Sequence, residues 1–227
     1  MTGSPTDFAR NAQWEWVRLR RSQRIWLLLI PAVAGPVGSA IADLYLRVPS
    51  PATAQVLGLL ITAGLASLVL LDLTALAVGE DLVLRTHFLT FALPQSRAAA
   101  IAGRLTVAIG GSVVMFAIGA TLVVALASGL VATAPGAPPP ILVPSHLGIG
   151  LLGLLVLLGG VTAAAGLVTR SSSQALVAGV LAGVVVAGMG SLFLLEGRLS
   201  SSFPEALSVG GMIALGWTVF QFQRLDG

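Results

Sequence analysis

The residues that could do chemistry in this chain are few and widely separated. Asp72 is the one clear carboxylate inside an apolar stretch. Ionisable groups inside a membrane often mark a pathway or a proton relay, and the alternative is a carboxylate that pairs with a basic group near the interface. The serines at 171–173 and 200–202 have no base at a spacing that would activate a nucleophile. His87 and His146 lack companions at the spacing of metal ligands, so we expect neither a catalytic nor a metal site.

The basic residues of the chain are all arginine, and this excludes a nucleotide site of the P-loop type. That motif needs a lysine after its second glycine, and the sequence has no lysine. The cysteine count is also 0, which removes disulfides, thiolate metal sites and cysteine nucleophiles. We therefore expect the chain to bind no cofactor and not to be an enzyme by itself.

The composition is that of a protein embedded in a membrane. Among its 227 residues, 56% are hydrophobic and 9% are charged, whereas a soluble domain carries about 25% charged residues. Disorder is excluded because it requires low hydrophobicity and high charge. The mean hydropathy of +0.97 favours several membrane spans. A nucleic-acid partner is not expected, because such a chain has little water-facing surface on which to gather its arginines.

Six segments are long and apolar enough to cross a bilayer, which takes about 20 residues. The sequence therefore predicts an all-α integral membrane protein with a single transmembrane domain over 1–227. The predicted membrane helices are 25–46, 54–79, 105–131, 147–168, 175–195 and 206–222.

The arginines are distributed unevenly between the two ends of these predicted helices. An even number of spans places both termini on one side of the membrane, and ten of the twelve arginines fall on that side. Because arginine is enriched in cytoplasmic loops, we expect a multi-pass protein of the plasma membrane with both termini in the cytoplasm.

The segment 8–24 before the first span has the pattern of a helix that lies in the membrane interface. Its apolar residues follow helical spacing and its arginines occupy the other side, the pattern of an interfacial helix near anionic lipid. The residues concerned are Phe8, Ala12, Trp16 and Leu19 on the apolar stripe, and Arg10, Arg18, Arg20, Arg21 and Arg24 on the basic side. A simple basic topology signal is the alternative interpretation.

The segment 80–104 is a long cytoplasmic connection in a chain with few others, and such loops are usually functional. It opens with Glu80 and Asp81, and Pro94 ends any helix that begins near them. Ser96 is placed to cap the helix that follows. We expect a short helix at the cytoplasmic surface; an amphipathic loop resting on lipid is the alternative.

This combination resembles the permease subunit of type 2 ABC exporters, the ABC-2 type, which has the type V fold. The family pairs an interfacial N-terminal helix and six spans with a coupling helix between spans two and three. The residues that match its coupling segment are Thr86, Leu93, Pro94, Ser96 and Arg97, preceded by Glu80 and Asp81 as its acidic residues and followed by the small-Gly-basic run Ala102-Gly103-Arg104. Arg85 stands where the family has glycine, and Phe88 where it often has glutamate.

The resemblance implies that separate cytoplasmic ABC ATPase subunits dock on this segment and carry ATP and Mg. The docking residues would be the charged Glu80, Asp81, Arg85 and Arg97 and the apolar Leu89, Phe91 and Leu93. It also implies a second permease copy, identical or similar, with membrane lipids around the pair. The small extramembrane mass favours a hydrophobic or amphipathic cargo such as a drug, a peptide or a lipid.

Two other functions are compatible with the sequence. In an ATP-independent carrier or channel, Asp72 would be the coupling site and the 80–104 segment would only cover lipid. In a membrane scaffold without transport, substitutions at both places would be tolerated.

Overall fold

The computed structural model describes residues 5–22, 24–44, 51–83, 97–132, 145–195 and 202–224, and these residues form seven α-helices and no strand. The helices are α1 (Pro5–Arg21), α2 (Arg24–Leu44), α3 (Pro51–Val83), α5 (Arg97–Ala132), α6 (Ser145–Thr169), α7 (Ser172–Leu195) and α8 (Ser202–Arg224). The expected all-α class is confirmed for this part of the chain.

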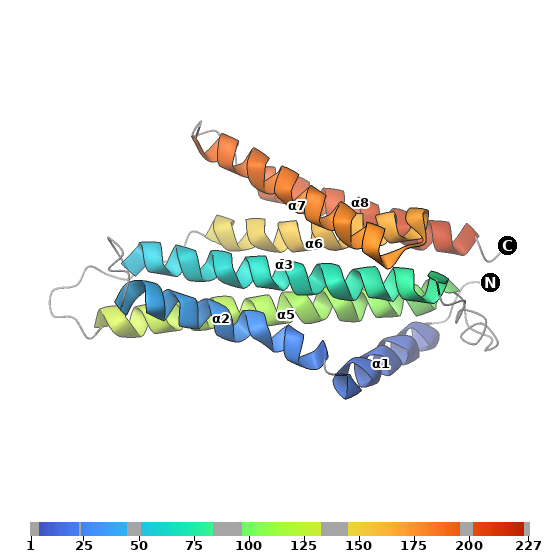
Figure 1. Cartoon of the computed structure of the whole chain (residues 1–227), viewed down its shortest axis with the longest axis horizontal. Coiled ribbons are helices and arrows are strands. Elements are labelled where there is room, and N and C mark those ends of the chain that lie inside the picture. Colours follow the sequence, from blue (N-terminus) through green and yellow to red (C-terminus); the bar gives the residue numbers. More distant parts are fainter. Residues whose placement is uncertain are drawn as a thin grey trace.

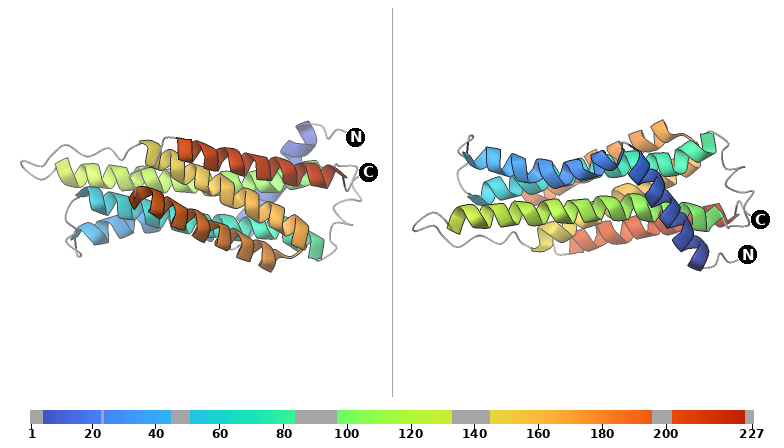
Figure 2. Two further views of the ribbon diagram at one scale, coloured as in Figure 1. Left: turned by 90° about the horizontal axis from the view of Figure 1, so that it is seen from above. Right: turned by 90° about the horizontal axis from the view of Figure 1, so that it is seen from below.

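Six of these helices run along one long axis, and α1 crosses that axis obliquely at one end of the bundle (Figures 1 and 2). Both chain termini lie at this same end (Figure 1). The end of α3 and the start of α5 lie at this end too.

Helix α3 is the centre of the bundle, because it packs against α2 and α5 on one side and against α6 and α7 on the other. Its side chains Ala66, Leu70 and Leu71 are buried with Phe116 of α5 and Leu155 of α6. Small side chains alternate with leucine here, so neighbouring backbones come close and fill the space by van der Waals contact.

Helices α6 and α8 approach closely because each presents a glycine to the other. A Cβ atom built on Gly211 would lie 2.6 Å from the backbone of Val156 and Leu157, and one built on Gly160 would lie 2.6 Å from the Gly211 carbonyl oxygen. No side chain fits at either position without moving a backbone. The glycines of these segments therefore fix the distance between two helices.

The described residues contain four helices long and apolar enough to cross a membrane. They cover Arg24–Ile41, Ala54–Val78, Ala100–Leu126 and Gly150–Thr169. Within the residues searched, α7 and α8 contribute the shorter apolar stretches Ser172–Val186 and Val209–Gln221. The chain thus has the helices of a membrane protein, and the fifth and sixth spans stay predictions.

The connection between the second and third spans is shorter than the expected 80–104 segment. Helix α3 continues to Val83, and α5 begins at Arg97. The sequence Arg-Ala-Ala-Ala-Ile-Ala that opens α5 explains the second difference, since alanine has the highest helix propensity and no proline follows in the helix. Residues 80–83 and 97–104 are therefore helical extensions of the two long helices.

Candidate functional site

Three of the residues expected to dock an ATPase lie at the ends of described helices, and the others lie outside the described residues. Glu80 and Asp81 are in the last turn of α3, and Arg97 is the first residue of α5. The expected surface helix lies outside the described residues, as do Arg85, Thr86, Leu89, Phe91, Leu93, Pro94 and Ser96. The structure places the end of α3 beside the start of α5, because Val78 of α3 is buried with Ile101 and Leu105 of α5.

Helix α1 docks on the beginning of α5 through a glycine. A Cβ atom on Gly103 would lie 2.9 Å from the backbone nitrogen of Ala12 and 3.1 Å from the Cβ of Asn11. With hydrogen in place of a side chain, the two helices cross almost backbone to backbone. The run Ala102-Gly103-Arg104, singled out in the sequence for its likeness to the entry of a third span, is the place where α1 rests.

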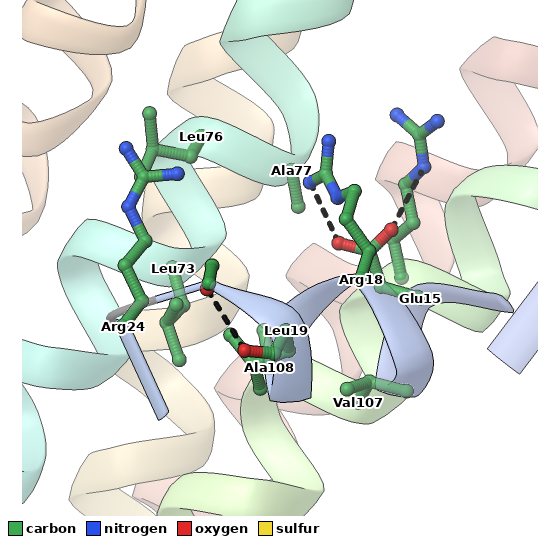
Figure 3. A pocket seen from close by; sticks show the side chains of 11 residues that line it. Glu15, Arg18, Leu19, Arg24, Leu73, Leu76, Ala77, Val107 and Ala108 are labelled. Atoms are coloured by element: carbon green, nitrogen blue, oxygen red, sulfur yellow. Dashed lines mark hydrogen bonds and ion pairs between the residues drawn. The ribbon is translucent and has the colours of Figure 1, made fainter. Parts of the chain in front are cut away.

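One carboxylate holds the crossing together electrostatically. Glu15 Oε1 accepts a 2.7 Å hydrogen bond from Arg18 Nη2 in the same helix, and Glu15 Oε2 lies 3.6 Å from Arg104 Nε of α5 (Figure 3). The side chains of Glu15 and Arg104 are only 13% and 15% exposed, against 49% for Arg18. The pair between helices is thus sheltered from water, and charges interact more strongly there than at an open surface.

The apolar side of α1 is anchored by Leu19. This side chain is buried with Leu28 of α2, Val69 and Leu73 of α3, and Ala108 of α5. A leucine held by three helices fixes the end of α1 that leads into α2. The hydroxyl of Ser22 then donates a 2.8 Å hydrogen bond to the Leu19 carbonyl oxygen, which satisfies one free group at the helix end.

The other residues expected on the interfacial helix lie on its outer surface. Phe8 and Trp16 are exposed to whatever surrounds the bundle, together with Arg18 and Arg21. Arg24 is half-buried and opens α2. Of the predicted apolar stripe, Leu19 packs on the bundle, whereas Phe8 and Trp16 leave large apolar surfaces uncovered by protein.

A cavity of about 130 Å³ lies where α1 meets α2, α3 and α5. Its polar wall is formed by Glu15, Arg18, Ser22, Arg24 and Arg104. The apolar wall consists of Leu19, Leu73, Leu76, Ala77, Val107 and Ala108. Figure 3 shows the Arg24 guanidinium on one side, near Leu76, and Arg18 with Glu15 on the other. The cavity therefore combines three guanidinium groups and one carboxylate with an apolar floor.

Asp72, the candidate pathway residue, lies in α3 next to Leu73, which packs against Leu19 of α1. Asp72 is half-buried, and it forms no hydrogen bond or ion pair within the described part of the chain. Its place along α3 is thus level with the end of α1 and not with the middle of the bundle.

Sequence reasoning missed the role of Glu15. This glutamate stands among arginines on α1, and its partner Arg104 is on a helix much later in the chain. The unusual carboxylate in a basic segment was the available signal, but nothing in the local pattern names its distant partner. Gly103 was noticed only for a likeness of motif, and its contact with α1 depends on the tertiary fold.

No protein-family model, no curated protein and no solved structure matches the chain. A functional proposal therefore rests on the sequence and on the geometry described above. Within the ranges that the structure describes, no group of three or more His, Asp or Glu side chains is placed to hold a metal ion. The feature that distinguishes the molecule is the junction of α1 with α2, α3 and α5.

Proposed function

We propose that the chain is the membrane-spanning permease subunit of an ATP-driven exporter of the type 2 ABC class. It would form the translocation path as a dimer with an identical or similar chain, and two separate cytoplasmic ATPase subunits would dock on it. The observation that carries the proposal is the docking of α1 on the first turns of α5, through Gly103 and the Glu15–Arg104 pair, at the end of the bundle where α3 ends and α5 begins.

A permease without its own nucleotide site needs a rigid element that receives a mechanical push. Helices α3 and α5 have 33 and 36 residues, which makes each about 50 Å long. The bilayer core is about 30 Å thick, so both helices are long enough to extend beyond it. A force applied to the segment 84–96 would therefore be carried directly into two membrane helices.

The lengths of α7 and α8 agree with their proposed roles as the fifth and sixth membrane spans. They contain 24 and 23 residues, or about 36 and 34 Å of helix, so each is long enough to cross the bilayer core. Six spans would place both termini on one side, in agreement with their common position at one end of the bundle. The arginines of α1, with Arg170 and Arg224, favour the cytoplasm for that side.

The cargo class follows from the small extramembrane portion of the chain. Because most of the sequence is apolar helix, the exporter would take its cargo from the membrane or from the interface. We propose a hydrophobic or amphipathic drug, peptide or lipid as cargo. ATP and Mg would be bound by the ATPase partner.

The experiment that tests this function is purification of the tagged chain from its native membrane in mild detergent. We expect a soluble ATPase in fixed stoichiometry and ATP hydrolysis sensitive to vanadate. Leu93→Ala and Arg97→Gln should release the ATPase, since both residues belong to the proposed docking segment. Arg224→Gln is the matched control, because it removes one arginine at the same end of the bundle but on α8.

Two outcomes would overturn the proposal. One is a chain that purifies without an ATPase under conditions that keep known complexes intact. The other is equal loss of the ATPase from Arg97→Gln and Arg224→Gln. In the first case an ATP-independent carrier becomes the better hypothesis, and loss of transport in Asp72→Asn would then support it.

A further inference from the structure

We propose that the cavity between α1, α2, α3 and α5 is a binding site for a phosphate group, which is carried by an anionic lipid or is free in solution. This inference does not depend on the transport function, because it rests only on the charges and the walls of the cavity. The residues that would hold the phosphate are Arg18, Arg24 and Arg104.

The first argument is an imbalance of charge. Among the described residues that line the cavity, three carry guanidinium groups and Glu15 is the only carboxylate. Glu15 is already engaged with Arg18 and Arg104. Arg24 forms no ion pair within the residues described. The site therefore carries an excess positive charge that a phosphate group would neutralise.

The second argument is that two of the three guanidiniums are preorganised. Glu15 pairs with Arg18 and Arg104, and Arg24, which also lines the cavity, lies apart from Glu15 and Arg18 (Figure 3). Guanidinium groups bind phosphate through paired N–H donors, and less entropy is lost when their positions are already set.

The third argument is the apolar floor. Leu73 and Ala77 of α3 and Ala108 of α5 form the side of the cavity that faces the bundle. An apolar wall lowers the local dielectric constant and strengthens the attraction between guanidinium and phosphate. A lipid would place its headgroup in the cavity and its chains along the exposed apolar side chains at the start of α2, such as Trp26 and Leu29.

The position in the bundle fits a phosphate of the membrane interface. The cavity lies at the junction of α1 with the bundle, at the end where both termini are found. Basic pockets between membrane helices on the cytoplasmic side are suited to anionic headgroups. The outer basic residues of α1 attract such lipids only diffusely, whereas the cavity would select one phosphate.

The test is a binding titration on the full-length chain purified in a neutral detergent. Short-chain phosphatidylglycerol, phosphatidylcholine with the same chains, and inorganic phosphate are added separately, and the thermal unfolding midpoint is followed by tryptophan fluorescence. We expect saturable stabilisation by phosphatidylglycerol and a much weaker effect of phosphatidylcholine, whose phosphate is paired with choline. If inorganic phosphate competes with phosphatidylglycerol, the natural ligand is the free ion; if it does not, the ligand is the lipid.

The variants separate a defined site from diffuse attraction. Arg24→Gln removes a cavity arginine, and Arg20→Gln removes an exposed arginine of α1 that does not line the cavity. Loss of a hydrogen bond between a guanidinium and a bound phosphate should lower the affinity about tenfold, whereas an arginine outside the site loses no such bond. We expect at least that loss for Arg24→Gln and less than a twofold loss for Arg20→Gln.

Conservative variants keep the test decisive if Arg24→Gln does not fold. Arg24→Lys retains the charge and loses the paired N–H donors, so it should bind phosphatidylglycerol more weakly than Arg20→Lys does. Equal affinities in these pairs of variants, or no saturable binding of any phosphate compound, would overturn the proposal.

Discussion

At the scale of single residues, Glu15 is the most informative side chain, because its carboxylate contacts two arginines from different helices. Its carboxylate is sheltered, and so is the Arg104 side chain that it faces. Removing one partner of such a sheltered group leaves the other without compensation, which costs more than the loss of an exposed ion pair. Glu15 also limits repulsion among the three arginines that surround the cavity.

Glu15→Gln should loosen the docking of α1. The glutamine keeps the shape of the side chain and removes the negative charge between Arg18 and Arg104, at a cost on the order of 1 kcal/mol. The measurement is the rate of trypsin cleavage at the arginines of α1 in the purified protein, and we expect an increase of about fivefold. Asp72→Asn is the control, because it removes a carboxylate that has no ion pair with the described residues. Equal cleavage rates for the two variants would contradict this role for Glu15.

At the scale of elements, the crossing of α1 and α5 depends on a missing side chain. Gly103 brings the α1 backbone next to α5, and the Glu15–Arg104 pair lies one turn of α1 beyond the contact at Asn11 and Ala12. The close approach and the ion pair support each other, since a wider separation would also lengthen the distance between the two charges.

Gly103→Val should displace α1 from the bundle, because even the first carbon of its side chain would meet the α1 backbone at 2.9 Å. Overpacking of this kind costs about 1–3 kcal/mol. Gly110→Val is the matched control on the same helix, since a Cβ there has nothing within 4 Å. The readout is the thermal midpoint of the detergent-solubilised chain, together with trypsin cleavage of α1. A Gly110→Val variant that is as destabilised as Gly103→Val would refute the argument.

The elements were predicted better than the contacts between them. Apolar length alone identified the helical segments, because twenty apolar residues leave few other structures open in lipid. Helix α5 begins at Arg97, directly after Ser96, the residue that the sequence placed as the cap of the next helix. The docking of α1 on α5 was not predictable from the sequence, because Glu15 and Gly103 meet their contact partners only when distant parts of the chain fold together.

At the scale of the whole molecule, the two ends of the helix bundle differ in the chain segments that they hold. The end covered by α1 holds both termini, the end of α3 and the start of α5. It also holds the turn between α6 and α7, where Arg170 has a φ of 52°. This left-handed conformation costs a non-glycine residue about 1 kcal/mol, and here it places a positive charge directly at the helix end.

Single-cysteine labelling should report this asymmetry, and the chain offers a background with 0 cysteines. Ser173→Cys lies in the first turn of α7, at the end that we assign to the cytoplasm, and Ala137→Cys lies in the predicted external segment 132–146. In intact cells a membrane-impermeant maleimide should label Ala137→Cys and not Ser173→Cys. Permeabilised cells should show labelling of both. The reverse pattern in intact cells would invert the assigned orientation.

The ion pair between Glu15 and Arg104 also implies an order of events during synthesis. Its two partners are separated by about 90 residues, and at 5–20 residues per second a ribosome needs roughly 5–20 s to add them. During that interval α1 and then α3 are made, whereas the partner of Glu15 on α5 is still missing. On the topology that we propose, the first helix would stay at the membrane surface until α5 arrives to receive it.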